Sequence, residues 1–206
     1  MIVHHFTTPI TTPFARKSTQ IYGDLRRLWE KAKIKESAKK PEITGLCRLI
    51  KGYKIMIKVL FVCHGNICRS PMAEFLLKDM IKKEGLADRF VIASAGTSRE
   101  EIGNPVHQGT RKKLAQDHIS AADKYAVQLT KEDYEKYDLI LGMDRANISN
   151  ILRIIGSDPQ EKVHRLLDFT ELPRDIADPW YTGDFEITYA EIKAGCAALL
   201  KHLRRF

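Results

Sequence analysis

Apolar and polar positions along residues 56–206 follow two patterns, short apolar runs and stripes with helical spacing. A nearly continuous apolar run at 57–62 predicts a buried parallel strand. Further strands are expected at 90–95, 137–143 and 163–167. Because strands and helices alternate, the pattern predicts an α/β fold of three layers, with a four-stranded parallel sheet and helices on both faces.

The helix after the first strand is expected to have Ser70 as its N-cap and Pro71 at its first position. Its inner face carries apolar residues, and Glu74, Lys78 and Lys82 recur every four residues on the outer side. The pattern therefore predicts an amphipathic helix that packs on the sheet.

Three more helices are expected along the chain. One spans about 105–117 with Asn104 as its cap, and another follows a capping Asp144. The last helix has a single apolar stripe, made of Phe185, Tyr189, Ile192, Cys196, Leu199 and Leu203. A long loop that crosses Pro173 and Pro179 precedes it.

The charge of the chain lies at one end. The net charge is +8, and the first 55 residues hold 12 Lys and Arg against 4 Asp and Glu, so they carry the entire excess. Residues 56–206 are balanced, which argues against nucleic acid as a partner of that part. We interpret 1–55 as a basic N-terminal extension. Its segment at 21–32 is interpreted as a solvated helix docked on its neighbour or as part of a poorly ordered arm, and the alternative is a basic amphipathic helix for a membrane surface or an acidic partner. A start site placed too early would also produce such a segment, since Met56 resembles an ordinary beginning.

Composition limits the class of protein further. A hydrophobic fraction of 44% excludes a wholly disordered chain, and no apolar run approaches the ~20 residues of a membrane span. Four cysteines do not suggest a disulfide framework, which favours a reducing, cytoplasmic location.

The loop at 63–69 joins the first strand to a helix and carries candidate chemistry. Backbone N–H groups and the helix dipole converge at such a place and bind anions. Cys63 begins the loop, where these groups favour a thiolate, and Arg69 ends it with a planar fork that matches phosphate oxygens. The pair suggests transfer of a phosphoryl group to sulfur.

These cysteines have three other interpretations. Cys63 and Cys68 form half of a zinc site at most, and no second pair follows at a usable spacing, so no metal is expected. A thioredoxin-like Cys-x-x-Cys is absent. Both residues could also be small buried hydrophobic side chains.

The run VLFVCHGNICRSP at 59–71 resembles the signature of low-molecular-weight protein tyrosine phosphatases. The similarity extends from about Ile57 to about Phe206 and includes SAGT at 94–97, EIGNP at 101–105, LTKED at 129–133 and ADPWY at 177–181. This resemblance implies a flavodoxin-like phosphatase domain at 56–206, without a cofactor, that acts on tyrosine-phosphorylated proteins.

The resemblance also implies roles for individual residues. Cys63 is the expected nucleophile, Arg69 the phosphate clamp and Ser70 the hydrogen-bond partner of the thiolate. Asp178 is expected to protonate the leaving phenol and then to activate water. Cys68 is expected to form a reversible disulfide with Cys63, which protects the nucleophile from irreversible oxidation.

The remaining site residues follow from the same resemblance. Phosphate is expected to contact the loop residues His64, Gly65, Asn66, Ile67 and Cys68. Asn66, Ser94 and His118 match a network that holds the loop in shape, and Trp180 and Tyr181 match the walls around the phosphoaryl ring. Glu100 stands where many relatives carry an aromatic residue, which favours basic or non-peptide substrates.

Alternative functions remain beside phosphotyrosine hydrolysis. A phosphoarginine phosphatase of this fold carries a small Thr before the second cysteine, where this chain has Ile67. An arsenate reductase needs redox cysteines in the middle of the chain, and residues 70–195 contain none. A phosphate-binding module without catalysis is the non-enzyme alternative, and weak self-association is left open.

Overall fold

The computed structural model describes residues 56–204. The predicted N-terminal extension, including its helix at 21–32, lies outside the described residues.

Four strands form one parallel sheet with the order β2-β1-β3-β4. β1 (Ile57–Cys63) pairs with both β2 (Phe90–Gly96) and β3 (Leu139–Gly142), and β3 pairs with β4 (Val163–Arg165). The predicted four-stranded parallel sheet is confirmed. Since the strands run in one direction, the loops that follow them meet at one edge of the sheet.

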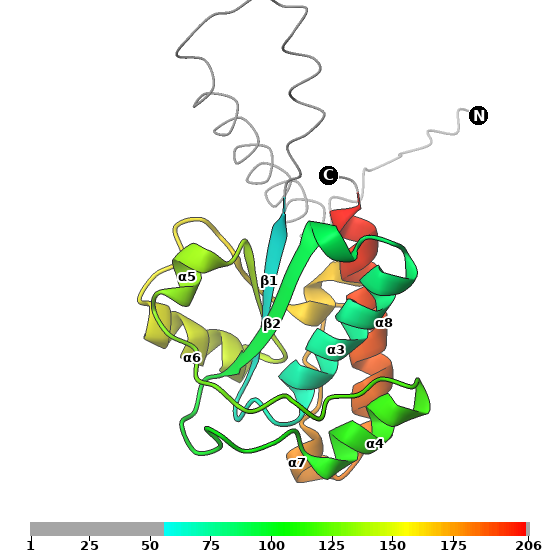
Figure 1. The fold of residues 1–206 in the computed structure, drawn as a ribbon. Coiled ribbons are helices and arrows are strands. Elements are labelled where there is room, and N and C mark those ends of the chain that lie inside the picture. Colours follow the sequence, from blue (N-terminus) through cyan, green and yellow to red (C-terminus); the bar gives the residue numbers. More distant parts are fainter. Residues whose placement is uncertain (1–55, 205–206) are drawn as a thin grey trace, which may run out of the picture. The chain divides into compact units, whose positions relative to one another are not determined.

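Helices cover both faces of this sheet, as predicted (Figure 1). α3 (Arg69–Lys83) and α8 (Phe185–Leu203) pack together on one face, with α4 (Gln108–Gln116) against both of them. α5 (Asp133–Lys136) and α6 (Arg145–Ile155) lie on the other face. The short elements η1 (Ala87–Arg89), η2 (Leu166–Phe169) and α7 (Pro179–Thr182) complete the described fold.

Two hydrophobic cores result because successive side chains of a strand point to opposite faces. In β1, Val59 and Phe61 pack in the core under α3 and α8, whereas Leu60 and Val62 pack in the core under α6. All four side chains are buried, which explains why β1 is a continuous apolar run. The predicted stripe of α8 faces the first core, where Ile192, Cys196, Leu199 and Leu203 are fully buried and Tyr189 nearly so.

The predicted start of α3 is wrong. The helix begins at Arg69, no side chain caps it, and Pro71 is its third residue. The Ser70 hydroxyl lies within hydrogen-bond distance of the Cys63 sulfur and of the Ala95 carbonyl oxygen instead. The Ser70 side chain therefore forms hydrogen bonds within the site and does not cap the helix.

The predicted cap of α4 is also wrong. The helix begins at Gln108, and His107 is its N-cap, with Nδ1 accepting a hydrogen bond from the Gly109 backbone at 3.1 Å. Pro105 forms an antiparallel bridge with Tyr125, so the chain is still extended where the helix was expected to start. By contrast, Asp144 caps α6 as predicted, accepting from the Asn147 N–H at 2.6 Å.

The last strand ends earlier than predicted. β4 stops at Arg165, and a 3-10 helix replaces the rest of the expected strand. Asp168 accepts hydrogen bonds from the backbone N–H and the guanidinium of Arg165, which turns the chain at this point. The expected strand at 137–143 likewise shortens to Leu139–Gly142.

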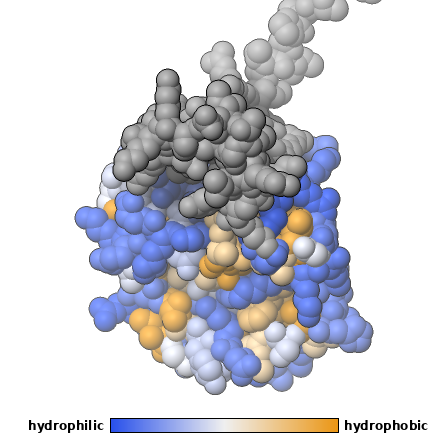
Figure 2. Space-filling view, turned by 45° about the horizontal axis from the view of Figure 1, so that its top comes forward, coloured by the Kyte–Doolittle hydropathy of each residue, from blue (hydrophilic) through white to orange (hydrophobic). Residues whose placement is uncertain are grey.

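The described surface shows two general features. No helix within residues 56–204 combines the length and the apolar character that crossing a bilayer requires. On the part of the face that Figure 2 leaves uncovered by grey atoms, hydrophobic side chains form several small groups separated by hydrophilic ones.

Candidate active site

The loop between β1 and α3 surrounds the sulfur of Cys63. Cys63 is the last residue of β1, and its side chain is buried with the residue 3% exposed. The Asn66 backbone N–H points to the sulfur at 3.3 Å, and the Ser70 oxygen lies 3.0 Å from it. The Asn66 side chain donates to that oxygen, so the hydroxyl proton of Ser70 has two acceptors within reach, the sulfur and the Ala95 carbonyl oxygen at 3.2 Å. The sulfur thus lies among hydrogen-bond donors at the beginning of a 15-residue helix, an arrangement that binds anions.

Glycine at the end of β2 allows the loop to approach the sheet. A Cβ atom on Gly96 would lie 2.7 Å from the His64 carbonyl oxygen. The adjacent backbone continues the contact, because the Thr97 and Ser98 N–H groups donate to the carbonyl oxygens of Cys63 and His64 at 2.9 Å. The loop is therefore fastened along its first half to the neighbouring strand.

Arg69 is a buried cation with its guanidinium held on two sides. Nη1 donates to Asp144 at 2.6 Å and to the Ile176 carbonyl oxygen at 3.0 Å, and Nη2 donates to Asp178. Burial alone lowers the pKa of Arg69, but the neighbouring Cys63, Asp178 and Asp144 outweigh it and raise that pKa. Nε is buried, and no group of residues 56–204 accepts a hydrogen bond from it. One donor of the fork is therefore still available to an anion.

Asp178 reaches the site from the loop before α8. One carboxylate oxygen caps α7 by accepting from the Trp180 N–H at 3.1 Å, and the other contacts Arg69. The Asp-Pro pair thus begins a short helix within the stretch that the sequence predicts as a loop. The helix fixes the position of the carboxylate beside the cysteine loop.

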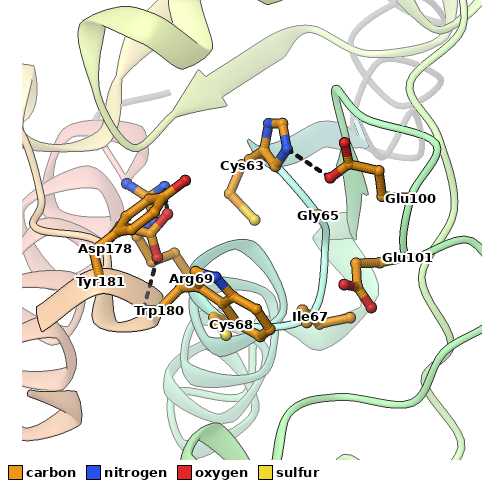
Figure 3. A pocket seen from close by; sticks show the side chains of 11 residues that line it. Cys63, Gly65, Ile67, Cys68, Arg69, Glu100, Glu101, Asp178, Trp180 and Tyr181 are labelled. Carbon is orange, nitrogen blue, oxygen red and sulfur yellow. Dashed lines mark hydrogen bonds and ion pairs between the residues drawn. The ribbon is translucent and has the colours of Figure 1, made fainter. Parts of the chain in front are cut away.

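A pocket of about 120 Å³ opens above these groups (Figure 3). Its lining contains the nucleophile candidate, the cation and the carboxylate, together with His64, Gly65, Ile67 and Cys68 of the loop. Trp180 and Tyr181 stand on one side, and Glu100 and Glu101 stand on the other. Trp180 and Tyr181 are 59% and 82% exposed, so they are free to contact a flat ligand rather than being packed in the core.

An aromatic contact supports the wall formed by Trp180. The His107 ring meets the Trp180 ring edge-on with centroids 6.0 Å apart, and it stacks on Phe185 at 5.1 Å. The backbone N–H of His107 also donates to the Ile67 carbonyl oxygen of the cysteine loop at 2.9 Å. The sequence does not indicate His107 as a site residue, because nothing in its spacing relates it to the loop.

Asn66 supports the loop from behind instead of lining the pocket. It is completely buried, with φ at +58°, and its amide donates to Ser70 and Ser94 at 2.9 Å each. Its Oδ1 accepts from the Val127 N–H at 3.0 Å. The expected role in holding the loop fits this position of Asn66 and Ser94.

Glu74 and Lys124 extend this network, although the sequence indicated neither of them. Glu74 was expected on the outer face of α3, but it is 4% exposed and accepts from the Ser94 hydroxyl at 2.6 Å. Lys124 donates to the Ser94 carbonyl oxygen at 2.9 Å and lies 3.7 Å from Glu74. Burial lowers the pKa of Lys124, while the nearby carboxylate of Glu74 opposes that shift.

The expected position of His118 in this network is wrong. His118 follows the C-terminal end of α4 on the surface, with φ at +60°. An exposed side chain cannot join the buried group behind the loop, and Lys124 is the cation that reaches Ser94.

The cysteines of the described residues are free thiols. Burial raises the pKa of Cys68 to about 12, and the negative charges of Cys63 and Asp178 add to that shift. Cys68 is therefore a neutral thiol beside Cys63 at neutral pH. No group of three or more His, Cys, Asp or Glu side chains with the arrangement of a metal site occurs in the described part of the chain.

Comparisons with known proteins give a consistent result. The family model described as low molecular weight phosphotyrosine protein phosphatase matches residues 58–206. The low molecular weight protein-tyrosine-phosphatase YfkJ of Bacillus subtilis is 41% identical over 152 residues, which is 73% of this chain and 97% of that protein. PtpA of Staphylococcus epidermidis is 37% identical over 149 residues, covering 72% of this chain and 94% of the relative.

Solved structures agree with the sequence relatives. The crystal structure of YfkJ from Bacillus subtilis superposes with a TM-score of 0.72, covering 75% of this chain and 98% of that one. The low molecular weight protein tyrosine phosphatase SP-PTP from Streptococcus pyogenes has a TM-score of 0.65 at 39% identity, covering 72% of this chain and 93% of that one.

Proposed function

From the premise that this chain belongs to the low molecular weight phosphotyrosine protein phosphatase family, we propose how its residues perform the reaction. The chain is a protein-tyrosine-phosphatase, a hydrolase of phosphoric monoesters. In our proposal residues 56–206 are the catalytic domain and 1–55 an N-terminal extension. The reacting groups are Cys63, Arg69, Ser70 and Asp178.

In the first step, the Cys63 thiolate attacks phosphorus of a phosphotyrosine side chain. The S–P bond forms while the bond from phosphorus to the phenolic oxygen breaks, and the protonated Asp178 gives its proton to that oxygen. Tyrosine leaves as a neutral phenol, and phosphate remains on the sulfur.

In the second step, the Asp178 carboxylate removes a proton from a water molecule. The water oxygen attacks phosphorus, the S–P bond breaks, and Cys63 returns as the thiolate while inorganic phosphate leaves. One carboxyl group therefore acts as acid and then as base, so the proton balance closes over a cycle.

Arg69 and the loop amides stabilise the charge of the transferred phosphoryl group. Nε of Arg69 and the loop N–H groups are the donors we assign to the phosphate oxygens, with His64, Gly65, Ile67 and Cys68 around them. The ion pair between Asp178 and Arg69 competes with phosphate for the guanidinium, so substrate binding is expected to release the Asp178 carboxyl group toward the leaving oxygen.

One observation carries the proposal more than any other. The Cys63 sulfur lies within hydrogen-bond distance of the Ser70 hydroxyl and the Asn66 N–H at the start of α3, in the same pocket as Arg69. These donors and the N-terminal end of the helix surround the sulfur that we assign as the nucleophile. The exposed rings of Trp180 and Tyr181 suit an aryl phosphate.

A phosphoarginine phosphatase is the second candidate, since the same loop and aspartate serve a P–N bond equally well. Ile67 lines the pocket and is the feature that favours phosphotyrosine over phosphoarginine in our proposal. Cys63 and Cys68 are proposed to form a reversible disulfide under oxidising conditions. The reducing cytoplasm is the proposed location, because a phosphatase with a thiolate nucleophile requires reduced cysteines.

Kinetics of the full chain on matched peptides tests the function. Two peptides identical except for phosphotyrosine or phosphoarginine are assayed for release of inorganic phosphate. We expect turnover of the phosphotyrosine peptide and a much lower kcat/KM for the other. Preference for phosphoarginine would assign the second candidate function, and binding of phosphate without turnover of either peptide would indicate a non-catalytic module.

A further inference from the structure

The two sides of the substrate pocket differ in chemistry. Trp180 and Tyr181 belong to α7, whereas Glu100 and Glu101 lie between β2 and α4 (Figure 3). We call Glu100 and Glu101 the acidic wall. The aromatic side suits the ring of the substrate, whereas the two carboxylates of the acidic wall take no part in the chemical steps proposed above.

Both carboxylates of the acidic wall are held close to the cysteine loop. Glu101 accepts a hydrogen bond from Asn104 at 2.7 Å, and its Cγ would lie 3.0 Å from a Cβ placed on Gly65. Glu100 lies 3.3 Å from Nε2 of His64, the residue that follows the nucleophile. The Glu100 side chain is 75% exposed, so it still faces the mouth of the pocket. A carboxylate accepts several hydrogen bonds, and both glutamates therefore keep capacity for a further donor.

The charges that line the pocket favour a substrate that carries a positive charge in addition to its phosphate. Arg69 is the buried cation of the lining, and it is already paired with Asp144 and Asp178. The acidic wall adds two negative charges on the side where a substrate chain must enter. A substrate that brings only its own phosphate meets repulsion there, whereas one that brings a cation exchanges this repulsion for attraction.

We propose that the acidic wall binds a Lys or Arg side chain of the substrate that flanks the phosphotyrosine. The enzyme then selects phosphotyrosine peptides with basic neighbours over those with acidic neighbours. This inference rests on the proposed phosphatase function and names the class of substrate for that same pocket. The long stems of Lys and Arg reach the wall while the phosphotyrosine ring lies against Trp180, and an Arg can pair with a carboxylate through two hydrogen bonds.

The test compares peptides of one sequence in which the residues on both sides of phosphotyrosine are Lys, Ala or Glu. One exposed charge pair contributes at most about fivefold to kcat/KM, and replacing Lys by Glu also exchanges this attraction for repulsion. For the wild-type chain, kcat/KM is therefore expected to be about tenfold higher with the Lys peptide than with the Glu peptide. The ratio is expected to fall as ionic strength increases, since these charges are exposed.

Variants then locate the preference. The Glu100→Gln/Glu101→Gln double variant should reduce the Lys-to-Glu ratio to about one, and Glu100→Lys should invert it. The matched control is Glu171→Gln, an exposed glutamate outside the pocket lining, which should keep the wild-type ratio. Far-ultraviolet circular dichroism establishes whether each variant is folded. If the double variant does not fold, the Glu100→Lys variant still tests the preference.

The outcomes separate this inference from the function on which it rests. Turnover of all three peptides by the wild type at equal kcat/KM would overturn the basic-flank preference and leave the phosphatase intact. A wild-type preference that survives in the double variant and in Glu100→Lys would also overturn it. No turnover of any of the peptides would contradict the proposed function itself.

Discussion

Replacement of Asn66 by Ala tests whether the buried network behind the cysteine loop sets the geometry of catalysis. Asn66 does not line the pocket, and it is completely buried. Its amide group joins three segments, with donors to Ser70 and Ser94 at 2.9 Å and an acceptor for Val127 N–H at 3.0 Å. The substitution removes all three hydrogen bonds at once.

The expected loss of stability follows from these contacts. Each hydrogen bond contributes about 1 kcal/mol, so three of them account for about 3 kcal/mol. Alanine at the left-handed φ of +58° adds a cost of about 1 kcal/mol, because Asn tolerates this conformation better. The sum of about 4 kcal/mol is a large part of the 5–15 kcal/mol typical of a folded domain. A loop displaced by about 1 Å is expected to lower kcat/KM by about 10²-fold.

Urea denaturation and steady-state kinetics of the full chain measure the two effects. Asn150→Ala is the matched control, since Asn150 lies on α6 and only accepts a hydrogen bond from the exposed Arg153. We expect that control to stay within about 0.5 kcal/mol of the wild type. An Asn66→Ala variant that loses less than about 1 kcal/mol and keeps full kcat/KM would refute the reasoning, because the network would then carry neither stability nor geometry.

Three further predictions concern the site. Asp178→Ala is expected to slow hydrolysis of aryl phosphates by about 10²–10⁴-fold, and a decrease below about threefold would remove Asp178 from acid–base catalysis. His107→Asn keeps a cap for α4 but removes the ring beside Trp180, so KM for aryl phosphates should rise more than kcat falls; unchanged kinetics would contradict a supporting role. Burial raises the pKa of Cys68 from 9.0 to about 12, so the unfolded chain loses this proton before the folded one. The free energy of unfolding should therefore decrease as pH rises from about 9 toward 12, as measured by urea denaturation, and an equally steep decrease in Cys68→Ser would contradict this origin.

The strands and the C-terminal helix were predictable because the spacing of apolar residues along each segment indicates which of its faces are buried. β1 is buried on both faces and therefore reads as an apolar run, and α8 presents one apolar stripe to a single core. Helix starts were less predictable. Ser70 has the chemistry of a cap, yet its hydroxyl lies beside the Cys63 sulfur, a contact seven residues away that no local pattern indicates.

Long-range contacts account for the site residues that the sequence did not indicate. Glu74 follows the four-residue spacing of an exposed helix face, but Ser94 and Lys124 from two other segments surround it. A carboxylate with such partners can be buried where its neighbours Lys78 and Lys82 remain on the surface. His118 shows the opposite case, because its similarity to a family position did not place it near the loop.

The covalent intermediate tests the central claim most directly. The full chain is mixed with a phosphotyrosine peptide, quenched within the first turnover and analysed by peptide mass spectrometry, with Cys63→Ser as the parallel sample. We predict a phosphoryl group on the sulfur of Cys63 in the wild type, and in Cys63→Ser no turnover but retained binding of phosphate or vanadate. Substantial turnover by Cys63→Ser, or a phosphoryl group on another residue, would contradict catalysis by the Cys63 thiolate.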